Sequence, residues 1–342
     1  MRTFTVQILG AVLLTTVALA ASPRFVIDDD EYLQKVTDAG AKLLQEHKLQ
    51  PLKTLRTQVH TKGYRLKLAP LSRQKFDAPD LYDRLRESTL AVGIFYKCPD
   101  CEDWHFNSSG GFVVSEGVVS TCCHVILAQD KGVREAYLVA ADATGRVFPV
   151  QSVLAADTES DTCFLKVNVP GLKPLPLRPG IRTGERVYCL SHPGGYHFMF
   201  TQGLVARVNR LRNEVLDELG QTNGLLTRPI LFLNITAEFA PGSSGGPIVD
   251  EAGNVVGQVA SIADAGDPGA KDENTPPSPS VPVRFCTASE ELLHLADPRL
   301  KPKSPLEELK AHSPAVVPGT APLPPSGPPL KTRSPKSAES QP

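Results

Sequence analysis

The stretch from Thr89 to Ala288 limits what this chain can fold into more than any other feature. Its apolar and β-branched residues come in short runs that are separated by Gly, Pro, Asn and Asp, without helical patterns between the runs. Strands at this density predict an all-β domain, built as antiparallel barrels or as a sandwich. A stretch of about 200 residues is long enough for two barrels.

The segments that flank this β domain, residues 89–298, have a different character. In residues 21–88, apolar residues at helical spacing predict a first helix that ends before Pro51 and then a second helix. We expect this segment to be an N-terminal helical extension or a prosegment. A short helix is expected from Ala288 to Leu295. Residues 299–342 are rich in Pro and poor in large apolar residues, which predicts a disordered tail.

Residues 1–20 have the pattern of a secretory signal peptide. Arg2 supplies the positive charge, an apolar stretch runs from Ile8 to Leu19, and Ala18-Leu19-Ala20 offers small residues for cleavage. We therefore expect a secreted or periplasmic protein with no stable membrane insertion after cleavage. The alternative is an uncleaved anchor, for which the stretch is short, since a span needs about 20 apolar residues.

The charge balance gives no reason to expect nucleic acid as a partner. Lys and Arg total 36, and Asp and Glu total 37, so the chain has no net charge that would attract a polyanion. The Pro-rich tail is interpreted either as a ligand for a partner protein or as a passive spacer.

The first candidate for a catalytic residue lies in a Gly-rich turn between two expected strands. The turn has the sequence Gly242-Ser243-Ser244-Gly245-Gly246-Pro247. Such a turn exposes a serine hydroxyl and lets backbone N–H groups converge where the oxyanion of an acyl-transfer intermediate would sit. It predicts Ser244 as a nucleophile, with the N–H groups of Gly242 and Ser244 as the oxyanion hole. An ordinary Gly-Ser loop is the alternative.

A nucleophilic serine needs a base, and the base needs an orienting carboxylate. His124 directly follows the second of two apolar strands that flank a Glu-Gly turn. Asp161 immediately precedes another apolar strand, where a carboxylate is half buried and fixed in position. Asp157 and Glu159 come earlier in the same loop and are expected to be solvated.

Together these segments resemble the HtrA/Deg branch of the trypsin-like serine endopeptidases. Three segments recur in that branch, and here they are Gly111–Val125, Asp157–Asp161 and Pro241–Pro247. The resemblance covers residues 89–296. It implies two six-stranded antiparallel β-barrels with the active site in the cleft between them, and hydrolysis of peptide bonds without a cofactor or metal. It also implies a catalytic triad of His124, Asp161 and Ser244.

The resemblance also assigns a primary substrate pocket, because in this fold the pocket is lined by residues just before the nucleophile and by the strand after it. The residues at these positions are Glu238, Phe239, Ala240, Val259, Ala260 and Ser261. Glu238 at the base of the pocket would favour Lys or Arg in the substrate. The alternative turns its side chain outward, to the rim. Residues 263–281 form an acidic, Pro-rich loop that either shapes substrate access or is disordered.

The chain has seven cysteines, and four of them suggest a cross-link. Cys98 and Cys101, followed by His105, have a spacing found in metal sites and in disulfides. Because export favours oxidation, we expect one of this pair to form a disulfide with Cys122 or Cys123. Trypsin-like proteases often tie the histidine segment to this hairpin in that way. Free thiols and a zinc site are the alternatives.

These observations predict an exported serine endopeptidase that acts on proteins or peptides. Two interpretations from other classes remain. One is a catalytically silent, trypsin-fold binding protein. The other is a scaffold that presents the Pro-rich tail to a partner.

Overall fold

The computed structural model describes residues 24–60, 63–101, 103–127, 133, 135–212, 214–216, 222–226, 228–264 and 281–300. All of them lie within one compact unit of the chain. The predictions for the signal peptide (1–20), for nearly all of the Pro-rich tail and for most of the loop at 263–281 lie outside the described residues.

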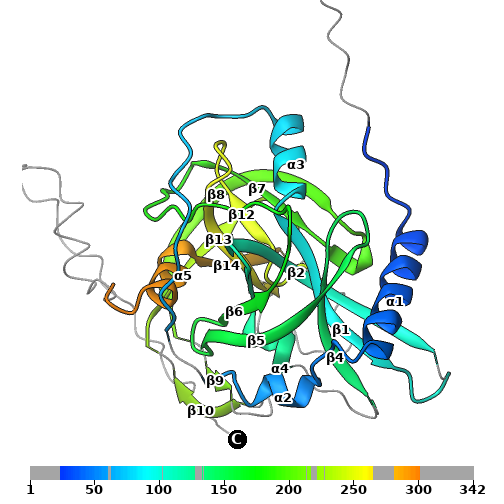
Figure 1. Cartoon of the computed structure of the whole chain (residues 1–342). Coiled ribbons are helices and arrows are strands. Elements are labelled where there is room, and N and C mark those ends of the chain that lie inside the picture. Colours follow the sequence, from blue (N-terminus) through cyan, green and yellow to red (C-terminus); the bar gives the residue numbers. More distant parts are fainter. Residues whose placement is uncertain are drawn as a thin grey trace, which may run out of the picture. The chain divides into compact units, whose positions relative to one another are not determined.

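Two closed antiparallel barrels of six strands each form the body of the molecule (Figure 1). The first barrel contains β1 (Thr89–Lys97), β2 (Trp104–Ser115), β3 (Val118–Thr121), β6 (Thr162–Val167), β5 (Val147–Asp157) and β4 (Ala136–Ala141), in that spatial order. The second contains β11 (Ile230–Ile235), β14 (Pro282–Ala288), β13 (Val255–Asp264), β12 (Pro247–Val249), β7 (Arg186–Ser191) and β8 (Met199–Leu211). The predicted two-barrel fold is confirmed, and the sandwich alternative is wrong. A two-stranded ribbon, β9 (Glu214–Leu216) and β10 (Thr222–Leu226), follows β8.

Strand β1 shows why the first barrel needs partners outside itself. Alternate side chains of a strand point to opposite faces. On β1 the inward face carries Leu90, Val92 and Ile94, which belong to the core of the barrel. The outward face carries Ala91 and Phe95, which belong to a second, outer core. Because both faces are apolar, β1 is stable only where other elements cover its outer face.

The N-terminal extension and the last helix supply that cover. Helix α1 (Asp29–Gln45), helix α3 (Ala78–Arg86) and helix α5 (Ser289–Ala296) share one apolar core with the outer faces of both barrels. The buried residues that they contribute are Tyr32, Val36, Leu81, Leu85, Leu292, Leu295 and Ala296. The fit is close, since a Cβ at Gly40 of α1 would lie 3.0 Å from the ring of Phe95.

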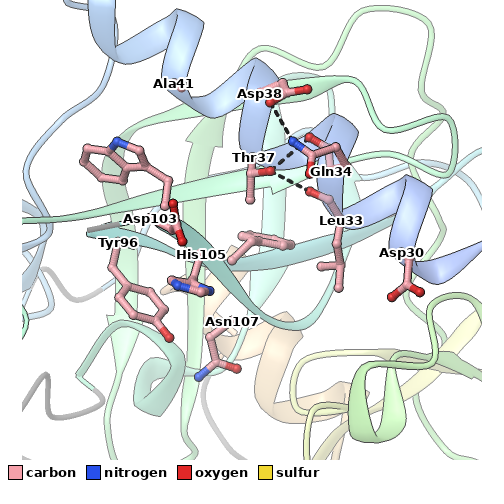
Figure 2. A pocket seen from close by; sticks show the side chains of 12 residues that line it. Asp30, Leu33, Gln34, Thr37, Asp38, Ala41, Tyr96, Asp103, His105 and Asn107 are labelled. Atoms are coloured by element: carbon pink, nitrogen blue, oxygen red, sulfur yellow. Dashed lines mark hydrogen bonds between the residues drawn. The ribbon is translucent and has the colours of Figure 1, made fainter. Parts of the chain in front are cut away.

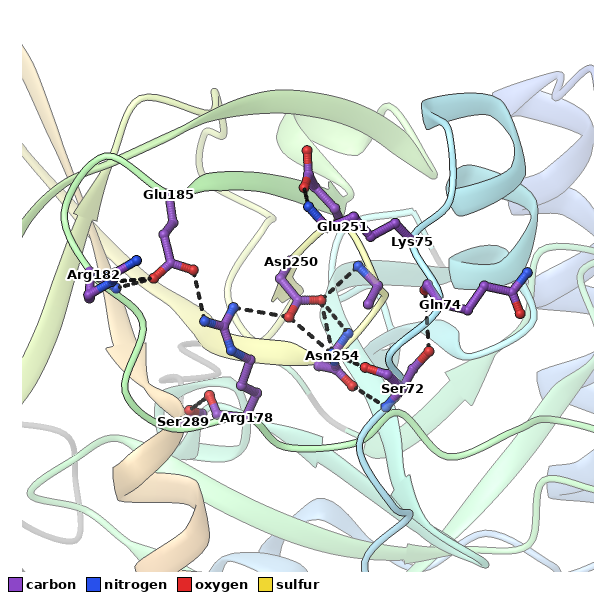
Figure 3. Close-up of polar contacts among 11 residues, drawn as sticks. Ser72, Gln74, Lys75, Arg178, Arg182, Glu185, Asp250, Glu251, Asn254 and Ser289 are labelled. Atoms are coloured by element: carbon purple, nitrogen blue, oxygen red, sulfur yellow. Dashed lines mark hydrogen bonds and ion pairs between the residues drawn. The ribbon is translucent and has the colours of Figure 1, made fainter.

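A buried amide fastens the segment between α2 (Leu52–Arg56) and α3 to the second barrel (Figure 3). Asn254 donates from Nδ2 to the carbonyl of Ser72 (3.0 Å), and its Oδ1 accepts from the Ser72 N–H (2.7 Å). Asp250 accepts from the same Asn254 Nδ2 (3.0 Å) and pairs with Arg178 (3.1 Å). Asn254 thus bonds Ser72 as a neighbouring strand would, which fixes the register of the extension on the barrel.

The helices form where capping residues and apolar spacing predict them. Asp28 caps α1 by accepting from the Glu31 N–H (3.0 Å), and Asp77 caps α3 by accepting from the Asp80 N–H (3.0 Å). The short helix predicted after Ala288 is α5. Helix α2 was not predicted. Whether the extension also acts as a prosegment stays a prediction. Within the described residues, no helix has both the length and the apolar character needed to cross a membrane.

The shared core predicts that the extension unfolds together with the barrels. Leu81 of α3 is fully buried in that core, so Leu81→Ala should lower the free energy of unfolding by about 3 kcal/mol. Leu71→Ala, in the same extension but 52% exposed, should change it by less than about 0.5 kcal/mol. Urea unfolding curves measure both. Equal stability of the two variants would show that α3 is not part of the cooperative unit.

Candidate active site

Asp161 holds His124 by two hydrogen bonds. Its Oδ2 lies 2.6 Å from Nδ1 of the His124 ring, and its Oδ1 accepts from the backbone N–H of His124 at 2.9 Å. Because an ionised carboxylate only accepts, the proton of the neutral ring sits on Nδ1 and leaves Nε2 free to accept another proton. This is the arrangement that a general base requires.

The local backbone is built for this contact. His124 lies on a single helical turn, α4 (Cys123–Leu127). All the other side chains of this turn are buried. Asp161 has φ of +55°, a left-handed conformation that Asp tolerates better than most residues. Strained backbone of this kind tends to occur at functional sites, where the surrounding structure enforces it.

The turn before β12 presents two unused N–H groups. Among the described residues, neither the Gly242 N–H nor the Ser244 N–H has a hydrogen-bond acceptor. Gly242 has φ of +94°, and a Cβ there would lie 2.6 Å from the carbonyl oxygen of His192, so only glycine fits. Two free N–H groups, one on each side of Ser243, are what an oxyanion hole needs.

The Gly-rich turn that carries Ser244 and the segment that carries His124 converge on one backbone carbonyl. The carbonyl of Val259 on β13 accepts from the Gly245 N–H (2.8 Å) and from the thiol of Cys122 (3.2 Å). The Ser244 carbonyl in turn accepts from the N–H of Gly110 on β2 (2.7 Å). Gly245, next to Ser244, and Cys122, two residues before His124, are therefore held at the same junction of the two barrels.

Ser244 and His124 both lie near this junction, but their side chains do not form a hydrogen bond with each other. Among the described residues no hydrogen bond joins the Ser244 hydroxyl to the His124 ring. In proteins without substrate, catalytic hydrogen bonds are often long and tighten only in the complex.

Comparison with known proteins agrees with this geometry. Residues 109–257 match the family model described as "Trypsin-like peptidase domain". This part of the chain, less than half of its length, is similar to a trypsin-like peptidase domain.

Relatives of the trypsin-like domain include "Serine protease HTRA2, mitochondrial" of Drosophila persimilis and of Drosophila grimshawi. They are 29% and 28% identical over 153 residues, which is 44% of this chain and 33% of each relative. The chain thus spans about one third of the length of the curated relatives that it matches. A solved structure, the active form of the Rv3671c protease from M. tuberculosis, is similar with a TM-score of 0.47 and 22% identity. That match covers 71% of this chain and 95% of the other.

Two buried histidines, His192 and His197, lie in the segment next to the turn that carries Gly242. The segment from His192 to Phe198 contains a short 3-10 turn, η1 (Pro193–Gly195), and its Gly194 N–H donates to the carbonyl of Pro241 (2.8 Å). His192 accepts at Nδ1 from the Phe198 N–H (3.1 Å), and its Nε2 lies 3.1 Å from the carbonyl of Leu90 on β1. His192 therefore bridges the two barrels as a neutral ring.

His197 ties the same segment to the N-terminal extension. Oδ1 of Asp29 in α1 accepts from the His197 N–H (3.0 Å) and lies 2.9 Å from its Nδ1. On the other side of the ring, Nε2 lies 3.2 Å from the hydroxyl of Ser108 on β2. Burial lowers the pKa of His197 although Asp29 opposes the shift, and burial lowers the pKa of His192 to about 3. No local sequence pattern marks Leu90 as the partner of His192 or Asp29 as the partner of His197, because both are distant along the chain.

Asp157 and Glu159 are engaged by Arg228, which the sequence did not single out. The guanidinium of Arg228 lies 2.8 Å from Asp157 and 3.4 Å from Glu159, and it also pairs with Glu291 of α5 (2.8 Å). Asp157 also accepts from the Ser160 hydroxyl (2.9 Å). These two carboxylates order the loop and leave Asp161 as the one that contacts His124.

The predicted pocket residues lie beside the turn that carries Ser244. Val259 and Phe239 are buried in the second barrel, and Ala260 lies at a bulge before Ser261, which is exposed. The side chain of Glu238 is 79% exposed and lies 3.9 Å from the guanidinium of Arg284. The structure therefore places this carboxylate outward, next to a cation.

The expected disulfide is not formed, since all seven cysteines are free thiols. Cys122 and Cys123 point to different buried sites, where their thiols donate to the carbonyls of Val259 and Thr162. Burial raises the pKa of Cys122, and a hydrogen bond with Cys163 together with burial raises that of Cys123. Cys98 and Cys101 lie instead in the β1–β2 loop with His105. The fold does not bring the two pairs together.

The neutral His192 predicts a loss of stability in acid. Its folded-state pKa lies below the ordinary value of 6.5, so the folded protein binds fewer protons than the unfolded chain. The contribution of His192 to the free energy of unfolding is therefore complete above pH 6.5. It falls as the pH decreases toward the folded-state pKa, by about 1.4 kcal/mol per pH unit.

When the pH falls from 7 to 5, the free energy of unfolding of His192→Gln should therefore decrease by about 2 kcal/mol less than that of the wild type. Urea midpoints at the two pH values measure this difference. The exposed His47→Gln variant should behave like the wild type. If the wild type and His192→Gln lost the same free energy of unfolding between pH 7 and pH 5, the buried, neutral state of His192 would be contradicted.

Proposed function

We propose that this chain is an exported serine endopeptidase whose catalytic groups are His124, Asp161 and Ser244. The observation that carries the proposal is the junction itself. It holds a histidine base oriented by a carboxylate and a serine in a Gly-rich turn with two free N–H groups. The trypsin-like domain match supports the same reaction.

In the proposed reaction, the Ser244 Oγ attacks the carbonyl carbon of a peptide bond while His124 Nε2 takes the hydroxyl proton. The N–H groups of Gly242 and Ser244 stabilise the oxyanion that forms. The intermediate collapses to a Ser244 ester, and His124 returns the proton to the leaving amine. Water then attacks the ester with His124 again as base, which releases the acid and restores the serine.

The pKa of His124 suits this role. Burial of the ring would lower the pKa, but the charge of Asp161 and its hydrogen bond outweigh that effect and raise the pKa above 6.5. A ring that gains a proton easily is a stronger base, but it is active only where it starts neutral. Activity is therefore expected to rise with pH through a pKa above 6.5.

For the substrate, we propose a protein or peptide without a strict requirement for Lys or Arg at the cleaved bond. Glu238 is exposed and paired with Arg284, whose own side chain is only 17% exposed and whose Nε donates to the carbonyl of Phe239 (3.4 Å). A half-buried cation next to the pocket offsets the carboxylate that would select a basic residue. Export rests on the signal-peptide pattern of residues 1–20.

A fluorophosphonate probe tests the nucleophile directly. The folded, full-length chain should be labelled on one serine, and Ser244→Ala should abolish labelling, because the probe forms a bond only with an activated serine. Ser152→Ala on β5 is the matched control and should be labelled like the wild type. A folded wild type that stays unlabelled would favour the catalytically silent binding protein instead.

The role of Asp161 is tested by its amide variant. Asp161→Asn should lower kcat/KM by about 10⁴-fold, because the amide leaves the ring in the wrong tautomer and its protonated form without a counter-charge. Glu159→Gln, in the same loop, should stay close to the wild type. The wild-type kcat/KM should fall with decreasing pH through a pKa above 6.5. A fall only below pH 6 would contradict the pairing of His124 with Asp161.

A further inference from the structure

The loop between β1 and β2 gathers two thiols and an imidazole outside the catalytic junction. The hairpin pairs Lys97 with Trp104, so the intervening residues form a short loop that carries Cys98 and Cys101, while His105 follows on β2. Among the described residues, two groups of three metal-donor side chains have their donor atoms within 4.8 Å of one another. One contains His124 and Asp161 and belongs to the catalytic junction. The other is Cys98, Cys101 and His105.

The distances within this loop cluster match those of a tetrahedral metal site. Cys101 Sγ and His105 Nε2 are 3.1 Å apart, and all three donor atoms lie within 4.8 Å of one another. Zn–S bonds of about 2.3 Å and Zn–N bonds of about 2.0 Å place two sulfurs about 3.8 Å apart and a sulfur and a nitrogen about 3.5 Å apart. Binding a metal would therefore lengthen the Cys101–His105 separation by about 0.4 Å, and no separation in the cluster exceeds the tetrahedral values by more than about 1.3 Å.

The strand ends that carry the ligands are held in place before any metal binds. The ring of Trp104 stacks on Phe95 (centroids 4.5 Å apart), and the ring of His105 stacks on Tyr96 (5.6 Å). At the base of the loop, the Cys98 N–H donates to the carbonyl of Asp103 (2.9 Å). A preorganised site loses less entropy on binding, so these contacts favour metal capture.

We propose that Cys98, Cys101 and His105 bind one zinc ion, with a water or an outside ligand atom in the fourth position. Thiolate and imidazole donors with this spacing select Zn²⁺ over Mg²⁺ or Ca²⁺, which prefer oxygen. The metal would close the loop of the hairpin by joining both of its strands.

A groove borders the proposed site at His105, and Cys101 is exposed at the surface. The groove measures about 760 Å³ and lies between α1 and the β1–β2 hairpin, with His105, Tyr96 and Asp103 on one wall (Figure 2). Asp30 and Asp38 of α1 line the opposite wall. These carboxylates would attract a cation from solution.

A disulfide between Cys98 and Cys101 is the competing use of the two thiols. A disulfide consumes only the two sulfurs and leaves the imidazole without a role, whereas a metal uses all three donors. The contact of His105 Nε2 with Cys101 Sγ therefore favours the metal.

Metal titration of the full-length chain tests the proposal without reference to protease activity. The protein is stripped with a chelator, kept reduced with a phosphine, and titrated with Zn²⁺ and with Co²⁺ as a spectroscopic probe. We expect about one Zn²⁺ per chain, and for Co²⁺ the intense visible bands of a tetrahedral site with a thiolate charge-transfer band. Cys101→Ser and His105→Ala should each weaken binding by at least about 100-fold. His47→Ala, another exposed histidine, should bind like the wild type.

Circular dichroism spectra of all variants establish that a loss of binding is not a loss of fold. Ser244→Ala should bind metal as the wild type does, which separates this site from the catalytic junction. Absence of stoichiometric binding by the reduced wild type would overturn the proposal. So would binding that survives both Cys101→Ser and His105→Ala. A Cys98–Cys101 disulfide in the isolated protein, with no metal bound after reduction, would assign the pair to redox chemistry instead.

Discussion

The hydrogen bonds to the carbonyl of Val259 are the contacts on which the arrangement of Ser244, His124 and Asp161 depends. Each barrel has its own apolar core, and a third apolar core covers the outer faces of both. At the junction near Ser244 and His124, buried polar contacts join the two barrels as well. The Val259 carbonyl receives a donor from each side of the junction, and nearby the Ser120 hydroxyl of the first barrel donates to Gln258 of the second (2.6 Å). Because these bonds are buried, breaking one leaves an unsatisfied polar group at high cost.

The parts that sequence predicts well are those specified by neighbouring residues. The strand pattern gave the barrels because alternation and turn residues are local signals. Ser244 was recognisable from its Gly-rich turn, and His124 and Asp161 from their places beside apolar strands. The structure joins His124 to Asp161 by two hydrogen bonds, and it brings the segment of Ser244 to the same junction. Their joint role as a triad stays a proposal.

The parts that sequence misses depend on partners far apart along the chain. His192 bonds Leu90, His197 bonds Asp29 and Asn254 bonds Ser72, and no local pattern marks any of these pairs. The predicted disulfide fails for a related reason. The sequence shows that Cys98 and Cys101 lie close together and that Cys122 and Cys123 precede a histidine. Only the fold shows that the first pair, in the β1–β2 loop, and the second pair, after β3, lie at different places.

The bond between Asp29 and His197 has a consequence for how this molecule can be dissected. A boundary drawn at Thr89, where the β pattern begins, would remove α1 and α3. Without α1, Phe95 would be exposed to water on its outer face, and His197 would lose the carboxylate of Asp29. The smallest recombinant fragment expected to fold therefore starts ahead of Asp29. Trimming that spares α1 would keep Asp29 on His197, whereas removal of α1 would take this carboxylate away.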